Sequence, residues 1–143
     1  MTTQDIRKIA FVCLHGSAKS LIAAEYCRRL AAERGLSIET TTSGPEPDAE
    51  IPANVVAGLA GDGIDVRGHK PLRVSKEGLA DAGHIVSFGC ALDGVAPPGI
   101  AVERWDDCPA VSDDYATARR FIAARIEKLL DRLASGRDGG GRR

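Results

Sequence analysis

The segment FVCLHGSAKSLIAAEY, residues 11–26, places a cysteine between an apolar run and a helix-like pattern. Cys13 ends the apolar run, and Lys19 and Ser20 stand where the helical spacing begins. A loop that leads from a strand into a helix presents successive backbone N–H groups, and the helix start adds partial positive charge. Such a loop binds a tetrahedral oxyanion and favours the thiolate form of a nearby cysteine. The segment therefore predicts a nucleophile, Cys13, beside an oxyanion site.

Each position of this loop has an expected role. Gly16 allows the positive φ that a loop wrapped around an anion requires, Lys19 supplies a full charge, and Ser20 donates a hydrogen bond to the sulfur. The expected anion-binding residues are Leu14, His15, Gly16, Ser17, Ala18, Lys19 and Ser20. These groups suit in-line attack of a thiolate on phosphorus or on the arsenic of arsenate. The alternative from spacing alone is that Cys13 is a small buried core residue.

Three further cysteines, Cys27, Cys90 and Cys108, are widely spaced and form no Cys-x-x-Cys pair. That spacing indicates neither a zinc ribbon nor a thioredoxin-type motif, so we expect no metal and no cofactor. Cys90 ends one predicted strand and Cys108 follows another; both are candidate redox partners of Cys13, with simple packing as the alternative. Cys27 lies within a predicted helix and is expected in the core.

Predicted strands alternate with predicted helices along the chain. Apolar or β-branched runs predict strands at 6–14, 36–44, 83–90 and 100–105, and helical spacing predicts helices at 18–34, at 52–60, after Ser75, and from a cap at Ser112. This alternation predicts an α/β fold, a four-stranded parallel sheet flanked by helices on both faces. Ligands of such sheets bind at the carboxyl ends of the strands. Cys13, Gly44, Cys90 and the WDDCP segment all fall at those ends.

The length of 143 residues predicts one domain, residues 1–135, followed by a flexible glycine-rich tail at 136–143. The net charge of -1 at pH 7 argues against nucleic-acid and anionic-membrane binding. The first residues lack the apolar core of a signal peptide, and no apolar run reaches the roughly 18 residues of a membrane span. We therefore expect a cytoplasmic protein with reduced thiols.

The chain resembles the low-molecular-weight protein tyrosine phosphatases and the related arsenate reductases. FVCLHGSAKSLIAAEY is similar to their Cys-x5-Arg-Ser loop, and TTSGPEP, GDGIDVRGHKPLRV, HIVSFGC and WDDCPA follow in the family's order. The resemblance implies the phosphotyrosine protein phosphatase I-like fold, with the loop at the carboxyl edge of the sheet. It also implies hydrolysis of phosphomonoesters such as phosphotyrosine at Cys13, a general acid in the loop after the fourth strand, and, at Cys90, the second thiol of the reductases.

Three positions depart from the family pattern. Lys19 stands where the family has arginine, so one compact charge replaces a planar fork that grips two oxygens. Cys108 occupies the position of the acidic residue before the proline, which leaves Asp107 or Asp106 as the general acid. Residues 110–111, alanine and valine, replace an aromatic pair that walls the phosphotyrosine pocket.

Three functions stay open at this point. The first is phosphomonoester hydrolysis through a Cys13 phosphoenzyme. The second is arsenate reduction, in which Cys13 attacks arsenic and Cys90, Cys108 or an external thiol takes up the oxidised state. The third is a non-catalytic oxyanion- or phosphoprotein-binding module that has lost the arginine and the acid. The expected partners are phosphate, arsenate or a phosphorylated substrate, and a thiol reductant.

Overall fold

Four parallel strands form the centre of the structure, a computed structural model that describes residues 8–100 and 102–142, with side chains through residue 134. The elements in chain order are β1 Lys8–Val12, α1 Lys19–Glu33, β2 Glu39–Ser43, α2 Ala53–Gly61, α3 Lys76–Leu79, β3 His84–Ser87, β4 Val102–Arg104 and α4 Tyr115–Arg142. The strands lie in the order β2-β1-β3-β4, and all three pairs are parallel. The predicted sheet is confirmed, with shorter strands than the sequence patterns indicated.

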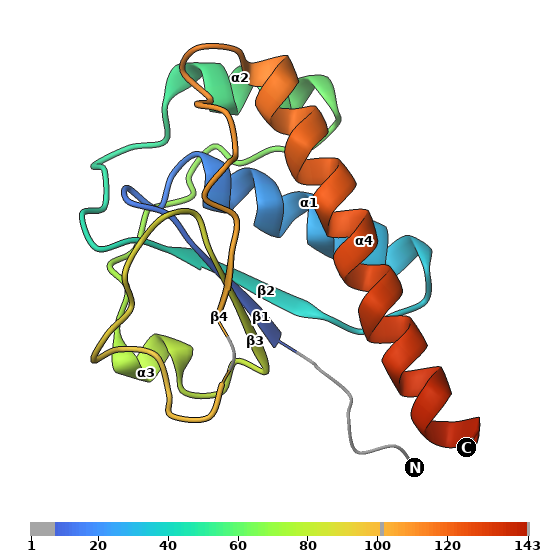
Figure 1. Cartoon of the computed structure of the whole chain (residues 1–143). Helices are drawn as coiled ribbons and strands as arrows, with labels where there is room; N and C mark the ends of the chain where they lie inside the picture. Colours follow the sequence, from blue (N-terminus) through green and yellow to red (C-terminus); the bar gives the residue numbers. More distant parts are fainter. Residues whose placement is uncertain (1–7, 101, 143) are drawn as a thin grey trace.

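Helices cover both faces of the sheet, as predicted (Figure 1). Alternate residues of a strand point to opposite faces, so a strand that is apolar at successive positions is buried on both. In β1, Ile9 and Phe11 pack in the cluster formed with α1, α2 and α4. Ala10 and Val12 pack in a smaller cluster with α3. The carboxyl end of β1 therefore emerges between two covered faces, and the loop that follows it starts from a fixed position.

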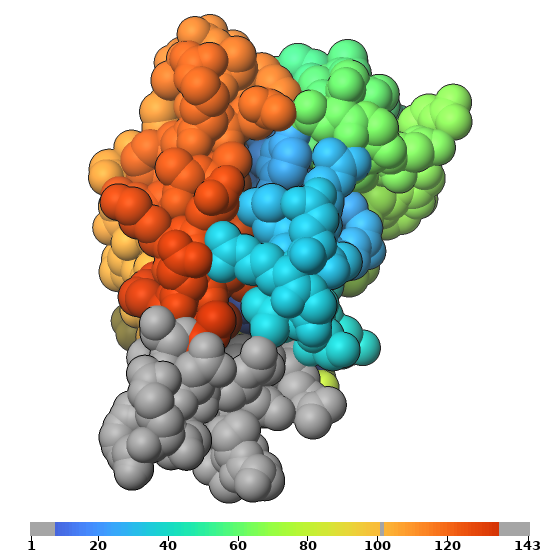
Figure 2. All heavy atoms as spheres, turned by 90° about the vertical axis from the view of Figure 1, so that its right-hand side faces the viewer, coloured from blue at the N-terminus to red at the C-terminus, as the bar shows by residue number. Residues whose placement is uncertain are grey.

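The helices α1 and α4 lie side by side on one face of the sheet (Figures 1 and 2). The buried face of α4 carries the apolar residues that the sequence places at helical spacing, namely Ala118, Ile122, Ile126, Leu129 and Leu130. Arg34, which follows α1, forms an ion pair with Asp131 of α4 at 2.7 Å. No helix in the ranges 8–100 and 102–142 is both long and apolar enough to cross a membrane.

The start of α4 corrects one prediction. Ser112 was expected to cap this helix, but α4 begins at Tyr115, and the Oδ1 atom of Asp114 accepts the backbone N–H of Thr117 at 3.1 Å. The three consecutive residues 112–114 are all good caps, and the local pattern could not choose between them. Because α4 starts later, Ser112 is left in the loop before the helix.

The end of α4 also differs from expectation. The helix continues to Arg142, so residues 136–142, which their glycine content predicted as a tail, are helical in this structure. The flexibility of this segment and the domain boundary at residue 135 stay predictions.

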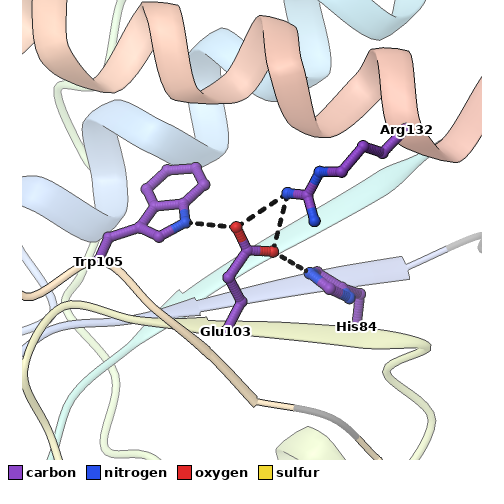
Figure 3. A network of polar contacts seen from close by, with 4 residues as sticks. All are labelled: His84, Glu103, Trp105 and Arg132. Carbon is purple, nitrogen blue, oxygen red and sulfur yellow. Dashed lines mark hydrogen bonds and ion pairs between the residues drawn. The ribbon is translucent and has the colours of Figure 1, made fainter.

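A polar network fastens β4 to β3 and α4 (Figure 3). The Glu103 carboxylate accepts hydrogen bonds from Trp105 Nε1 at 2.7 Å, His84 Nε2 at 2.9 Å and Arg132 at 2.9 and 3.0 Å. Burial raises the pKa of Glu103, but these donors outweigh it and hold the pKa below its ordinary value of 4.5. The fixed indole of Trp105 packs edge-on against Phe88, with ring centroids 5.5 Å apart. Through Trp105, the network thus holds Phe88, the residue that follows β3, in place.

Candidate active site

Cys13 follows β1 directly, and its sulfur is held by Ser20 in the first turn of α1. The Sγ atom lies 3.1 Å from Ser20 Oγ, and the Ser20 backbone N–H donates to Sγ at 3.4 Å. Ser20 Oγ also shares a hydrogen bond with Thr42 Oγ1 of β2. If Thr42 donates to Ser20, the serine hydroxyl hydrogen is free to point at the sulfur. In that orientation both the hydroxyl and the backbone N–H of Ser20 point at the sulfur.

The helix α1 begins without a side-chain cap. Ala18 stands at the N-cap, and the first turn contains no acidic residue. Within the described residues, Lys19 forms no ion pair, and the backbone N–H groups of residues 14, 15, 17 and 18 donate to no protein atom. The partial positive charge of this helix end is therefore uncompensated. Together with the ammonium of Lys19 it favours a bound anion.

The loop takes its shape from a close approach to the end of β2. Gly16 has a φ of +61°, and its N–H donates to the Cys13 carbonyl at 3.2 Å. Gly44 packs directly under the loop, where a Cβ atom would lie 2.2 Å from the Cys13 carbonyl oxygen and 2.7 Å from that of Leu14. The Cys13 N–H donates to the Ser43 carbonyl at 3.2 Å. The backbone of residues 43–44 therefore packs directly against the loop and restricts its conformation.

The loop opens into a pocket of about 310 Å³. The sulfur-bearing side is lined by Cys13, Leu14, His15, Ser17, Ala18 and Lys19, and the other sides by Asp48, Pro52, Asn54, Phe88, Ala110, Val111 and Ser112. Asn54 Nδ2 donates to the Val111 carbonyl at 3.3 Å and ties α2 to the 110–112 wall. That wall lacks an aromatic ring, as the sequence indicated, but Phe88 supplies one nearby. Because a water molecule takes up about 30 Å³, the pocket has room for more than a bare oxyanion.

Asp48, in the loop after β2, lines this pocket and was not singled out from the sequence. Its Oδ2 atom accepts the Ser17 hydroxyl at 2.7 Å. Its Oδ1 atom lies 3.6 Å from His15 Nδ1, which is 2.9 Å from the Glu46 carbonyl oxygen. One signal could have found Asp48: it follows a predicted strand at the same edge of the sheet as Cys13. The structure adds that Asp48 contacts the loop between β1 and α1.

The two carboxylates predicted as general acids do not line the pocket. Asp107 forms an ion pair with Arg125 at 2.8 Å, and Asp106 forms one with Arg104 at 3.1 Å. Their side chains are 65% and 53% exposed. Cys108, which follows them, is buried. Neither carboxylate lines the pocket with Cys13, and an acid role for either stays a prediction.

All four cysteines are buried and free of disulfides. Cys27 lies in the core as predicted, and burial raises its pKa to about 12. Cys108 packs in the same cluster as Cys13, whereas Cys90 packs in the cluster on the opposite face of the sheet. Burial raises the pKa of Cys90 and raises that of Cys108 to about 11. Both are protonated thiols at neutral pH, and a redox role for them stays a prediction.

Known proteins share this fold and its order of segments. Residues 8–94 match the family described as low molecular weight phosphotyrosine protein phosphatase. A Halobacterium salinarum protein named "Putative arsenate reductase" is 24% identical over 136 residues, which cover 92% of this chain and 96% of that protein.

Two solved structures agree with this match. The crystal structure of YfkJ from Bacillus subtilis has a TM-score of 0.79 at 21% identity and covers 92% of this chain and 96% of its own. The tyrosine phosphatase Wzb from Escherichia coli K30, in complex with sulphate, has a TM-score of 0.72 at 13% identity and covers 90% and 99%. The resemblance inferred from the sequence is confirmed: the chain belongs to the low molecular weight phosphotyrosine protein phosphatase family.

Proposed function

We propose that this protein is a cysteine-dependent enzyme acting on tetrahedral oxyanions, and that its main reaction is hydrolysis of phosphomonoesters through a Cys13 phosphoenzyme. The observation that carries this proposal is the contact of the Cys13 sulfur with the first turn of an uncapped helix, at the base of an open pocket. An anion bound there meets backbone N–H groups and the Lys19 ammonium. In such a site the bound anion and the nucleophile are held by the same loop.

The proposed reaction has two steps. The Cys13 thiolate attacks phosphorus, the P–S bond forms, and the P–O bond to the leaving alcohol breaks. Water then attacks the phosphocysteine, the P–S bond breaks, and phosphate and the thiolate are released. Lys19 and the loop amides stabilise the charge on the equatorial oxygens in both steps. The pocket volume of about 310 Å³ and the ring of Phe88 suit an organic group attached to the phosphate.

A specific observation favours arsenate reduction as the second candidate. The pocket contains no carboxylate from the loop after β4, and Cys90 lies in the loop that follows β3, the strand paired with β1. In this reaction the Cys13 thiolate displaces hydroxide from arsenate. A second thiol then attacks the Cys13 sulfur, arsenic keeps the bonding electron pair and leaves as arsenite, and the two thiols become a disulfide. Because burial holds Cys90 and Cys108 protonated, an external thiol is the more accessible reductant.

The deciding experiment compares wild type with Cys13→Ser in two assays, p-nitrophenyl phosphate hydrolysis and thiol-coupled arsenate reduction. We expect hydrolysis by the wild type and none by Cys13→Ser. Arsenate turnover without hydrolysis would replace the main proposal by the second, and Cys90→Ser would then separate internal from external reduction. Activity that survives in Cys13→Ser would overturn both. Phosphate binding without turnover in either assay would identify a binding module.

A cytoplasmic location belongs to the same proposal. A nucleophilic thiolate and three further free cysteines need a reducing compartment to stay unpaired. We accordingly propose an oxyanion or its ester as the substrate and a cellular thiol as the partner of the second reaction.

A further inference from the structure

The proposed reaction needs a proton at the leaving oxygen, and the structure holds no donor where the family resemblance implies one. The identity of this proton donor matters only if the proposed function holds, and the inference rests on that function. Asp106 and Asp107 each form an ion pair with an arginine and do not line the pocket. Cys108 is buried, and burial raises its pKa to about 11, so it is a poor acid. A donor must therefore come from another part of the pocket.

The pocket also carries a titratable pair, His15 and Asp48, and both residues line it with Cys13. Half of the His15 side chain is exposed, so the imidazole can exchange protons with water. Its Nδ1 atom lies 2.9 Å from the Glu46 carbonyl oxygen and 3.6 Å from Asp48 Oδ1. Because a carbonyl oxygen only accepts, Nδ1 carries the hydrogen. The imidazole therefore exchanges its second proton at Nε2.

Asp48 is held against the loop with one carboxylate oxygen toward this imidazole. Its Oδ2 atom accepts the hydroxyl of Ser17 at 2.7 Å, and Ser17 is buried within the loop. The Asp48 backbone N–H also donates to the His15 carbonyl at 3.1 Å. Oδ2 of Asp48 is therefore occupied by Ser17, and Oδ1 faces Nδ1 of His15.

We propose that His15 is the catalytic acid and base of this site and that Asp48 is its positioning residue. As the Cys13 thiolate forms the P–S bond, the Nε2–H of protonated His15 gives its proton to the oxygen of the breaking P–O bond. The alcohol leaves neutral, and Nε2 is left with a lone pair. That lone pair then takes a proton from the water that attacks the phosphocysteine. The thiolate and the protonated imidazole are restored, so no outside reagent is needed.

The test uses two substrates that differ in their need for an acid. Phenolate is a much poorer leaving group than p-nitrophenolate, so phenyl phosphate depends far more on protonation. His15→Asn keeps a side-chain N–H near the position of Nδ1 and removes Nε2. We expect it to lower kcat/KM for phenyl phosphate by about 100-fold or more and that for p-nitrophenyl phosphate by only a few fold. His69→Asn, a histidine that does not line the pocket, is the matched control.

The positioning role of Asp48 has its own readout. Asp48→Asn should reproduce the selective loss for phenyl phosphate, and the double variant His15→Asn/Asp48→Asn should lose little more than His15→Asn alone. Ser17→Ala separates this role from a purely structural one. If Asp48 serves only to hold the loop through Ser17, both Asp48→Asn and Ser17→Ala will slow the two substrates equally, which overturns the positioning role.

The outcomes also separate this inference from the proposed function. Loss of all activity in Cys13→Ser together with equal rates of His15→Asn and wild type on phenyl phosphate would refute the acid role and leave the phosphoenzyme intact. A selective loss in Asp107→Asn instead would return the acid to the loop after β4. The melting temperature of His15→Asn should match that of wild type because His15 is half exposed, and this match excludes misfolding as the cause.

Discussion

Replacing Gly44 by alanine tests whether the backbone at the end of β2 shapes the loop between β1 and α1. Gly44 does not have a positive φ, so alanine is compatible with its backbone. Its Cβ atom, however, would lie 2.2 Å from the Cys13 carbonyl oxygen, 2.6 Å from Gly16 N and 2.7 Å from the Leu14 carbonyl oxygen. All three neighbours are backbone atoms of the loop. They cannot rotate away as a flexible side chain would.

The size of the effect follows from these distances. Cβ atoms in proteins do not approach heavy atoms closer than 3.0 Å, so the Cys13 carbonyl must retreat by at least 0.8 Å. A misplacement of about 1 Å at a catalytic group costs about 100-fold in rate. Overpacking of a well-packed site costs about 1–3 kcal/mol, which corresponds to a fall in melting temperature of about 3–10 °C for a chain of this size. We therefore expect a large loss of activity with a modest loss of stability.

The assay measures kcat/KM for p-nitrophenyl phosphate and, independently of turnover, the protection of Cys13 from iodoacetamide by inorganic phosphate. Gly61→Ala is the control, because a Cβ there meets nothing within 4 Å. We expect Gly44→Ala to lose both activity and protection, and Gly61→Ala to keep both. Activity and protection within threefold of wild type in Gly44→Ala would refute the idea that residues 43–44 set the geometry of the loop.

Three further predictions address the site and its supports. Lys19→Met should lower kcat/KM for p-nitrophenyl phosphate by about 100-fold, because it removes a charge aimed at the bound anion. Lys19→Arg should keep or raise this value. Equal values for wild type and both variants would show that the charge is not used. Gly58→Ala should lower the free energy of unfolding by about 1–3 kcal/mol, because its Cβ would lie 2.2 Å from the Tyr115 ring. Gly61→Ala in the same helix should cause no such loss of stability. Calorimetry of the two variants measures this difference. Glu103→Gln should cost about 1–2 kcal/mol at pH 7, since hydrogen bonds to the carboxylate are charge-assisted. Because the folded pKa of Glu103 is lowered, that stabilisation is complete above its ordinary pKa of 4.5 and is lost as the pH falls through the lower folded value. The gap in melting temperature between wild type and Glu103→Gln should therefore narrow in acid, and a gap that is the same at every pH would contradict the network's ionic character.

Local patterns in the sequence were sufficient to predict the sheet and the position of Cys13 at its edge. An apolar run that stops at Cys13, followed by small and polar residues and then helical spacing, can only be a buried strand that turns into a helix. Parallel strands connected through helices must then bring their carboxyl ends to one edge. Cys13, Lys19 and Ser20 follow from these local rules, and the structure places them accordingly.

The remaining site residues depend on contacts between distant segments, which no local pattern specifies. The side chain of Asp48 reaches Ser17 across 31 residues of sequence, and Asn54 reaches the Val111 carbonyl across 57. Asp106 and Asp107 have the right residue type and lie near the expected proline, but they pair with arginines and do not line the pocket. The sequence by itself determined that the sulfur of Cys13 lies with Lys19 and Ser20 at the carboxyl edge of the sheet. Only the tertiary structure decided which side chains face that sulfur, because the direction of a loop side chain is set by its partners in space.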